Sequence, residues 1–222
     1  EACEYLTKVL DKSPLLLTEL DLSEDKLGDL DGEKLSALLM DSHSKVEKIK
    51  LNNCELTEKS CSVLATVLSS KTILKALNLN NSRLLDSGVK EICEGLKNPV
   101  CELKILKVSN CSITEEGYKA LASALRSNLS HLIELDLRGN DPGQSGVKEL
   151  SDLLQDQKCQ LKTLRFLSHD ADEACQYVRR IVGKNPLLLR ELNLSKRELG
   201  DTRVNQIAAL LQDKHCKLNT LM

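Results

Sequence analysis

Aromatic side chains are nearly absent from this chain of 222 residues, which holds three tyrosines, one phenylalanine and no tryptophan. Sites that stack nucleic-acid bases or enclose quaternary ammonium groups are built from such rings. The composition therefore nearly excludes base-stacking platforms and aromatic cages. With so few rings, the core has to be filled by aliphatic side chains, and leucine takes that place.

An excess of charge of either sign is also missing. Lys and Arg number 31 and Asp and Glu number 33, which gives a net charge of −2. A general nucleic-acid binder carries a strongly basic surface, so we expect no nucleic-acid partner. No apolar run approaches the roughly 18–20 residues that a membrane-spanning helix needs, and we expect no membrane partner.

A signal peptide and a disulfide framework are missing as well. The chain opens with Glu1 and Glu4, where a signal peptide is basic, and the opening is typical of the inside of a helix. We therefore expect a fragment of a larger protein. Nine cysteines form an odd count without a Cys-x-x-Cys pair, which suits buried free thiols in the reducing cytoplasm.

A leucine-rich motif recurs along the whole chain. Its pattern is L-x-x-L-x-L-x-x-x-x-L, with other apolar residues at some positions, and successive copies begin 28 or 29 residues apart. Self-similarity at such a fixed period is the signature of a solenoid. The copies begin at Leu17, Val46, Leu74, Leu103, Leu132, Leu161, Leu189 and Leu218.

Each copy predicts one strand and one helix. The L-x-L core alternates inward and outward residues, as a short strand does. Between the strands, apolar residues recur at spacings of three and four, which predicts an amphipathic helix. The helical faces include Tyr118, Leu121, Ala122 and Leu125, then Val147, Leu150, Leu153 and Leu154, and finally Val204, Ile207, Ala208 and Leu211.

Stacked copies of this unit predict an α/β solenoid. One strand and one helix cannot bury their apolar faces alone, so neighbouring copies have to share a core. Because helices are wider than strands, we expect a right-handed α/β horseshoe with parallel strands on the concave face and helices on the convex face. It should form one domain over residues 1–222 with about seven full repeats. Residues 1–16 would form a partial repeat helix, and residues 218–222 would begin an eighth repeat.

The detailed repeat sequence resembles a known family. Glu134–Asn140 (ELDLRGN) followed by Ser145–Leu150 (SGVKEL) shows the L-x-E-L-D-L-x-x-N strand type, and repeats of 28 and 29 residues alternate. This combination resembles the ribonuclease-inhibitor-like leucine-rich repeats in vertebrate NLR proteins, the NACHT-LRR receptors of innate immunity.

The resemblance implies a function in protein interaction. In an NLR receptor the repeats would sense a ligand and help to hold the ATP-binding NACHT domain inactive, within cytoplasmic inflammasome-type signalling. The implied partners are the NACHT domain of the same protein and an unknown ligand or regulator. The phosphate-binding loop G-x-x-x-x-G-K-[ST] does not occur in this chain, so no cofactor is expected here.

A stand-alone inhibitor of an enzyme, as ribonuclease inhibitor is, stays open as an alternative. That class binds a cationic partner, which favours an acidic, aromatic-rich concave face. The outward residues of this chain are mixed in charge and nearly free of aromatic rings, so we prefer the receptor interpretation.

One polar position after each strand departs from the family pattern. Asn or Cys there normally bonds backbone groups along the turn, and His169 and Arg197 are too large to do so in the usual way. We therefore expect irregular geometry in repeats six and seven. The residues at this position are Asp25, Cys54, Ser82, Cys111, Asn140, His169 and Arg197, of which only Cys54, Cys111 and Asn140 match the pattern.

Catalytic and metal-binding motifs are missing from the sequence. The four histidines belong to no triad and no metal motif. His215 and Cys216 are adjacent, but Cys216 continues a series with Cys101 and Cys159 just before successive strands. A packed structural cysteine explains this position best, and we predict no enzyme activity, no catalytic residue and no metal site.

The outward residues of the strands form the candidate interaction surface. Equivalent positions of neighbouring strands lie about 4.8 Å apart, and one column holds Lys107, Asp136 and Arg165. One interpretation is a ladder of alternating charges that neutralise each other, each exposed pair contributing about 0–1 kcal/mol. The other is a mixed-charge docking patch for a protein partner, centred on Lys107, Asp136, Arg138 and Arg165.

The end of the sequence predicts weak self-association. Residues 218–222 read as a strand without its helix, whereas solenoids need terminal repeats with a polar outer face. An open parallel edge invites pairing with another chain. We expect weak self-association through this C-terminal edge, created by truncation of a longer protein.

All nine cysteines should be free thiols in the folded protein. Alkylation in denaturant without reductant should therefore add nine labels, counted by mass spectrometry. Loss of two or more labels to an intramolecular disulfide would contradict the cytoplasmic interpretation.

Overall fold

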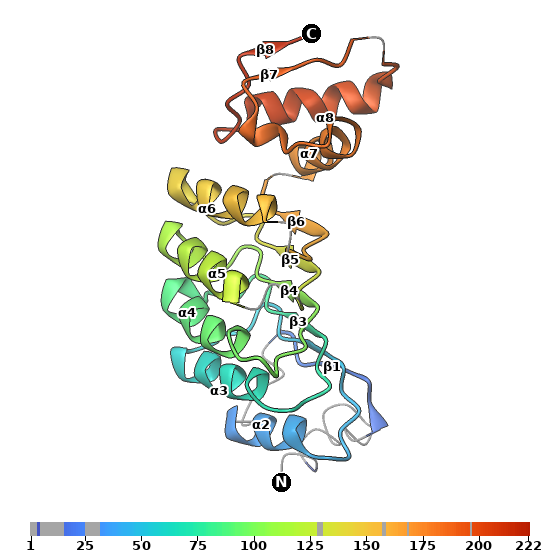
Figure 1. Ribbon diagram of the computed structural model, residues 1–222. Coiled ribbons are helices and arrows are strands. Elements are labelled where there is room, and N and C mark those ends of the chain that lie inside the picture. The colour runs from blue at the N-terminus through green and yellow to red at the C-terminus, as the bar shows by residue number, and fades with distance from the viewer. Residues whose placement is uncertain are drawn as a thin grey trace. The chain divides into compact units, whose positions relative to one another are not determined.

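The computed structural model describes residues 4, 16–24, 32–127, 131–156, 159–167, 169–195 and 197–222 (Figure 1). Strands and helices alternate over these residues, which confirms the predicted leucine-rich-repeat α/β solenoid. In chain order the elements are β1 (Glu19–Asp21), α2 (Gly32–Met40), β2 (Lys48–Lys50), α3 (Glu58–Leu68), β3 (Ala76–Asn78), α4 (Leu85–Leu96), β4 (Ile105–Lys107), α5 (Glu115–Ser127), β5 (Glu134–Asp136), α6 (Gly143–Gln155), β6 (Thr163–Arg165), α7 (His169–Val182), the 3-10 helix η2 (Pro186–Leu188), β7 (Glu191–Leu192), α8 (Gly200–Gln212) and β8 (Thr220–Leu221).

The chain divides into two compact units, Glu1–Leu164 and Arg165–Met222. The expectation of one repeat domain over residues 1–222 stays a prediction. The partial repeat helix expected over residues 1–16 falls outside the described residues except for Glu4 and Leu16. Strand β8 occupies the place at which the eighth copy of the motif begins.

The strands pair in the order of the sequence. One parallel sheet runs from β1 to β6, and β7 pairs with β8 in a second sheet. In the first unit the strands lie on one side and helices α2 to α6 on the other (Figure 1). Equivalent residues of successive repeats lie opposite one another, so the inward column of the first five strands is Leu20, Ile49, Leu77, Leu106 and Leu135.

The core of the first unit lies between the strands and the helices. The inward strand residues just named are at most 1% exposed, and the predicted face of α5 is buried in full. Tyr118 on this face is among the largest fully buried side chains. Its hydroxyl donates a 3.1 Å hydrogen bond to the Leu137 carbonyl, which satisfies the polar end of the ring.

Asn140 ties two neighbouring repeats together through their backbones. Its Nδ2 donates to the carbonyl oxygens of Val108 (2.8 Å) and Leu137 (2.9 Å). Its Oδ1 accepts from the amides of Cys111 (2.9 Å) and Ile113 (3.2 Å). One side chain thereby satisfies four backbone groups in the turns that follow β4 and β5, where no strand partner is available.

Two thiols and one hydroxyl play the same part in other repeats. Cys111 donates from Sγ to the Leu79 carbonyl at 3.1 Å, and Cys54 donates to the Leu22 carbonyl at 3.3 Å. Ser82 donates to the Leu51 carbonyl at 2.9 Å and accepts from the Cys54 amide at 3.3 Å. Ser82 departs from the Asn or Cys of the pattern, as predicted, yet its hydroxyl reaches the equivalent carbonyl that a thiol or an amide reaches elsewhere.

Repeat six differs from the other repeats in the length of the connection after its strand. Seven residues, 108–114, separate β4 from α5, whereas only three, 166–168, separate β6 from α7. Helix α7 begins at His169 itself, so this residue lies in the first turn of a helix instead of in a loop. The loop before α8 keeps seven residues, 193–199, so the irregularity predicted for Arg197 does not extend to loop length.

Helix α8 buries a different face from the predicted one. Ile207 and Leu210 are buried, whereas Val204 and Leu211 are 51% and 41% exposed and Ala208 is exposed. The predicted helix is confirmed over Gly200–Gln212, and the equivalents of these three residues in α3 and α5 are buried. No further helix follows α8 among the described residues.

All cysteines of the described part of the chain are free thiols, and Cys3 lies outside it. Burial raises the pKa of Cys61 to about 11 and that of Cys93 to about 12. Burial also raises the pKa of Cys111 to about 12. These thiols are protonated at neutral pH, so they should react slowly until the protein unfolds.

Asn140→Ala should lower the free energy of unfolding by about 2–4 kcal/mol, because it leaves four enclosed backbone groups without their side-chain partner. Asn205→Ala, at an exposed position of α8, should change it by less than about 0.5 kcal/mol. Urea unfolding followed by circular dichroism measures both. Equal effects of the two substitutions would show that the hydrogen bonds from Asn140 to the backbone of the turns contribute nothing to stability.

Candidate protein-interaction face

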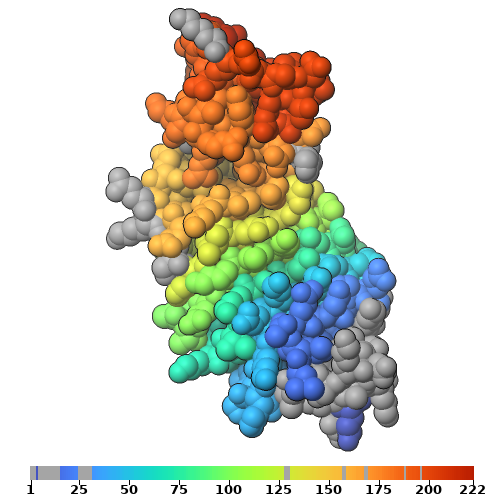
Figure 2. All heavy atoms as spheres, turned by 90° about the vertical axis from the view of Figure 1, so that its right-hand side faces the viewer, coloured from blue at the N-terminus to red at the C-terminus, as the bar shows by residue number. Residues whose placement is uncertain are grey.

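The outward side chains of β3, β4 and β5 form the candidate face of the first unit. Figure 2 views the molecule from the side on which these strands lie. The sheet register places Lys107 opposite Asp136 and Ile105 opposite Glu134, as the predicted columns require. Three of the four predicted patch residues, Lys107, Asp136 and Arg138, therefore lie together in this unit.

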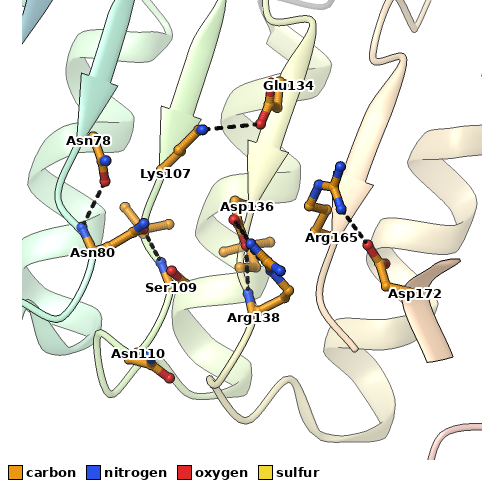
Figure 3. Close-up of polar contacts among 12 residues, drawn as sticks. Asn78, Asn80, Lys107, Ser109, Asn110, Glu134, Asp136, Arg138, Arg165 and Asp172 are labelled. Carbon is orange, nitrogen blue, oxygen red and sulfur yellow. Dashed lines mark hydrogen bonds and ion pairs between the residues drawn. The ribbon is translucent and has the colours of Figure 1, made fainter. Parts of the chain in front are cut away.

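Lys107 pairs diagonally across the strands. Its Nζ lies 3.5 Å from Oε1 of Glu134, and the side chains are 36% and 27% exposed. Figure 3 shows the two side chains reaching toward each other from β4 and β5. Half-exposed pairs of this kind contribute little to stability, so the ammonium group can exchange its partner for one on another protein at low cost.

Asp136 and Arg138 form a closer, bidentate salt bridge. Arg138 donates from Nε to Oδ1 at 3.0 Å and from Nη2 to Oδ2 at 2.6 Å, and its backbone amide also lies 3.2 Å from Oδ1. The Asp136 side chain is only 3% exposed, while that of Arg138 is 34% exposed. Asp136 is therefore too buried to contact a partner and instead positions the guanidinium group of Arg138 at the surface (Figure 3).

Arg165 is the first residue of the second unit. Its Nη1 lies 3.6 Å from Oδ2 of Asp172 and 3.6 Å from Oε1 of Glu173, both on α7. Asp172 is buried, at 2% exposure, and also accepts a 3.3 Å hydrogen bond from Gln176. Within the second unit Arg165 thus ties the start of α7 to the end of β6 by neutralising a buried carboxylate.

A band of uncharged residues borders the cations, and the sequence analysis missed its contribution. Asn80 accepts from the Ser109 amide at 2.9 Å, and Asn78 accepts from the Asn80 amide at 3.2 Å. Ile105 is half-buried and lies between Ala76 of β3 and Glu134 of β5. Glu134 was also missed as the partner of Lys107, although it stands in the neighbouring outward column. The candidate face is therefore a neutral band with Lys107 and Arg138 at one side.

The start of the sheet is balanced in charge. Lys50 Nζ lies 2.5 Å from Oε1 of Glu19 and 3.8 Å from Oδ2 of Asp21. The hydrogen bond to Glu19 raises the pKa of Lys50. Over the described residues, the strand face of the first unit therefore carries both signs in close pairs, and these join Lys50 to Glu19, Lys107 to Glu134 and Arg138 to Asp136.

His215 and Cys216, adjacent in the sequence, lie in the segment between α8 and β8. His215 Nδ1 lies 3.1 Å from Oδ1 of Asp213, and the neighbouring Cys216 is half-buried. Over the described residues, no three His, Cys, Asp or Glu side chains come together in a way that could hold a metal ion. In the same part of the chain, every helix is too short or too polar to cross a membrane.

Comparison with known proteins gives relatives over the whole chain. Ribonuclease inhibitor of Mus musculus is 34% identical over 220 residues, which is 99% of this chain, and that of Sus scrofa is 36% identical over 222 residues. The NACHT, LRR and PYD domains-containing protein 3 of Rattus norvegicus is 35% identical over 222 residues. No protein-family model matches the chain.

The alternating strands and helices and the ladder of turn side chains define a leucine-rich-repeat protein. Within that class, the chain belongs to the ribonuclease-inhibitor-like family of leucine-rich repeats that ribonuclease inhibitor and the NACHT-LRR proteins share. The resemblance seen in the repeat sequence is thereby confirmed. The chain spans 48% of the length of either ribonuclease inhibitor and 21% of the rat NACHT-LRR protein.

Arg138→Ala should destabilise the first unit by about 1–3 kcal/mol, because a nearly buried carboxylate loses two charged hydrogen bonds. Lys107→Ala should cost only about 0–1 kcal/mol, since its pair with Glu134 is half-exposed. Thermal unfolding of the two variants beside the parent chain measures the difference. A larger loss for Lys107→Ala than for Arg138→Ala would overturn this assignment of roles.

Proposed function

We propose that the chain is a protein-interaction region of a cytoplasmic NLR innate-immune receptor. The observation that carries the proposal is the similarity to NACHT, LRR and PYD domains-containing protein 3, which extends over all 222 residues in both Rattus norvegicus and Mus musculus. The described cysteines are all free thiols and five of them are buried, which agrees with a reducing compartment.

Binding, and not catalysis, is the activity we assign to the strand face. Lys107 and Arg138 are the cationic contacts, Ile105 is the apolar one, and Asp136 holds Arg138 in place. Such a surface fits a protein partner of mixed charge. Arg165 belongs to the second unit, where its guanidinium group forms ion pairs with Asp172 and Glu173. We propose that Arg165 contacts a partner only through the part of its guanidinium group that does not face these two carboxylates.

The proposed mechanism is a shift between two receptor states. The repeats contact the NACHT domain of the same protein in its closed state better than in its open state, and so stabilise the inactive form. A ligand that competes for the same repeats releases the NACHT domain, and the population moves toward the open state by no more than the difference in contact free energy. Inflammasome assembly would follow from that release.

The alternative is an inhibitor related to ribonuclease inhibitor, and the matches to two such proteins at 34% and 36% identity favour it. A cationic enzyme would require a strand face with an acidic surplus. Lys50 and Lys107 are instead each matched by a neighbouring carboxylate, and Arg138 by Asp136. This balance in the first unit is the reason to rank the receptor above the inhibitor.

The first experiment measures binding of the chain to the nucleotide-binding region encoded in the same reading frame, by isothermal titration calorimetry. Lys107→Glu should weaken binding at least tenfold, because it reverses a charge in the contact. Lys59→Glu, at an 82% exposed side chain on α3, should leave binding unchanged. A reading frame without a nucleotide-binding region, or equal effects of the two variants, would contradict the receptor proposal.

A ribonuclease assay decides the alternative directly. The chain in tenfold excess should leave the hydrolysis of RNA by a pancreatic-type ribonuclease unchanged. Inhibition that Lys107→Glu strengthens would favour the inhibitor, because a more acidic face attracts a cationic enzyme.

A further inference from the structure

Two arginines of the second unit lie against the ring of Tyr177. The Cζ atom of Arg203 on α8 is 4.8 Å from the ring centroid, and that of Arg180 on α7 is 6.0 Å from it. Tyr177 is half-buried, whereas the other described aromatic side chains, Tyr118 and Phe166, are buried. We call Tyr177, Arg180 and Arg203 the arginine–tyrosine cluster. The proposed receptor function does not use this cluster, so the inference rests on the second unit alone.

The two guanidinium groups of the cluster are not neutralised by a carboxylate within the described part of the chain. Arg203 donates from Nη1 to Oε1 of Gln206 at 2.7 Å, and this acceptor is uncharged. The Arg180 side chain is exposed and contacts the ring. Arg165 of the same unit shows the contrast, because two carboxylates of α7 lie 3.6 Å from its Nη1. The positive charge of the cluster can therefore attract an anion from outside.

Arg203 stands on the side of α8 that faces the preceding helix. The equivalent residue 57 positions earlier is Gly146 of α6, and a Cβ built on Gly146 would lie 2.9 Å from Cβ of Tyr118 on α5. Glycine at this position lets two successive helices touch, whereas arginine reaches the Tyr177 ring on α7. The cluster therefore lies where α7 and α8 contact each other (Figure 1), and not on the far side of α8.

The ring of Tyr177 positions the two cations without neutralising them. An aromatic ring attracts a cation through its negative π face and carries no net charge of its own. Arginine has five N–H donors in one plane, in a fork that matches the two oxygens of a carboxylate. In the first unit Asp136 positions Arg138 and removes most of its charge. The cluster instead offers positioned donors that keep their charge.

The second unit as a whole carries the matching net charge. Residues 165–222 contain ten Lys and Arg against seven Asp and Glu, a net charge of +3, whereas residues 1–164 contain 21 against 26, a net charge of −5. In the first unit Lys50, Lys107 and Arg138 are moreover paired with carboxylates. An anionic partner is therefore drawn to the second unit and not to the first.

We propose that the arginine–tyrosine cluster binds an acidic segment of another protein, in which two carboxylate side chains pair with Arg180 and Arg203. A segment with several Asp or Glu residues can satisfy both guanidinium groups at once, and it also gains from the positive charge of the whole unit. A neutral or basic segment would leave the two cations unpaired. Because the cluster lies at the surface, the binding should weaken as the salt concentration rises.

Fluorescence anisotropy of a labelled hexaglutamate peptide tests the proposal over about 1–1000 µM protein in reducing buffer, a range that covers weak binding. The parent chain should bind hexaglutamate at least tenfold more tightly than hexaglutamine. Raising the salt concentration from about 20 mM to about 300 mM should weaken the binding at least fivefold. Inorganic phosphate, added at constant ionic strength and equimolar to the peptide, should not displace it.

Charge reversal locates the binding. Arg180→Glu combined with Arg203→Glu should weaken the binding of hexaglutamate at least tenfold. Arg190→Glu combined with Lys217→Glu changes the net charge equally at two exposed residues of the same unit and should weaken it less than threefold. Arg180→Glu alone, at an exposed side chain, should weaken it at least threefold and keeps the test decisive if the double variant unfolds.

The role of the ring is tested by two substitutions of Tyr177. Tyr177→Leu removes the ring and should weaken the binding of hexaglutamate about two- to fivefold, whereas Tyr177→Phe keeps the ring and should leave the binding unchanged. Circular dichroism during heating checks that each variant stays folded at the temperature of the binding measurement.

Equal binding of hexaglutamate and hexaglutamine would overturn the proposal. So would equal losses in the cluster variant and its charge-matched control, because net charge alone would then explain the attraction. Displacement of the peptide by equimolar phosphate would show a site for a small anion and not for an acidic segment. None of these results bears on binding at Lys107 and Arg138, so the proposed receptor function is tested separately.

Discussion

Each strand–helix repeat of this chain leaves apolar residues uncovered until the next repeat packs against it. Cys61, Ala65 and Leu68 of α3 are buried. Helix α4 lies so close to them that a Cβ at Gly88 or Gly95 would crowd them. The strands obey the same constraint, since the parallel register joins each inward leucine to its equivalent in the next strand. Stability in such an array is a sum of contacts between neighbours.

That constraint leaves the strand face free for function. The helices and the inward leucines carry the stability, so the outward residues can vary in charge with little effect on the fold. In the first unit this freedom produces Lys107 and Arg138 beside an uncharged band, with Asp136 held beneath the surface.

Much of the fold could be predicted from the sequence because its main signal is periodic. The spacing of 28 or 29 residues predicts the strands, the helices and the register, and the column that contains Lys107 and Asp136 follows from that register alone. The position after each strand, where His169 stands in place of Asn or Cys, predicts that repeat six departs from the regular pattern, and its connection to α7 is short.

Other features of the site depend on neighbours that a single repeat does not reveal. The pattern identified the apolar residues of α8 but not that Ile207 and Leu210 are the buried ones, because burial depends on the packing of neighbouring elements. It placed Asp136 at the surface, whereas the adjacent Arg138 and the surrounding strands bury its carboxylate. It treated Ser82 as a departure, because the pattern records residue types and not the reach of a hydroxyl group.

Gly95→Ala tests the central claim, that close contact between successive repeats holds this structure together. In a helix that contacts nothing, replacing glycine by alanine stabilises by about 1 kcal/mol. In α4 the added methyl group would lie 2.7 Å from the Ala65 carbonyl oxygen and 2.8 Å from Leu68 Cβ. Overpacking of this kind costs about 1–3 kcal/mol, so urea unfolding should show a less stable protein. A variant more stable than the parent chain would contradict the account.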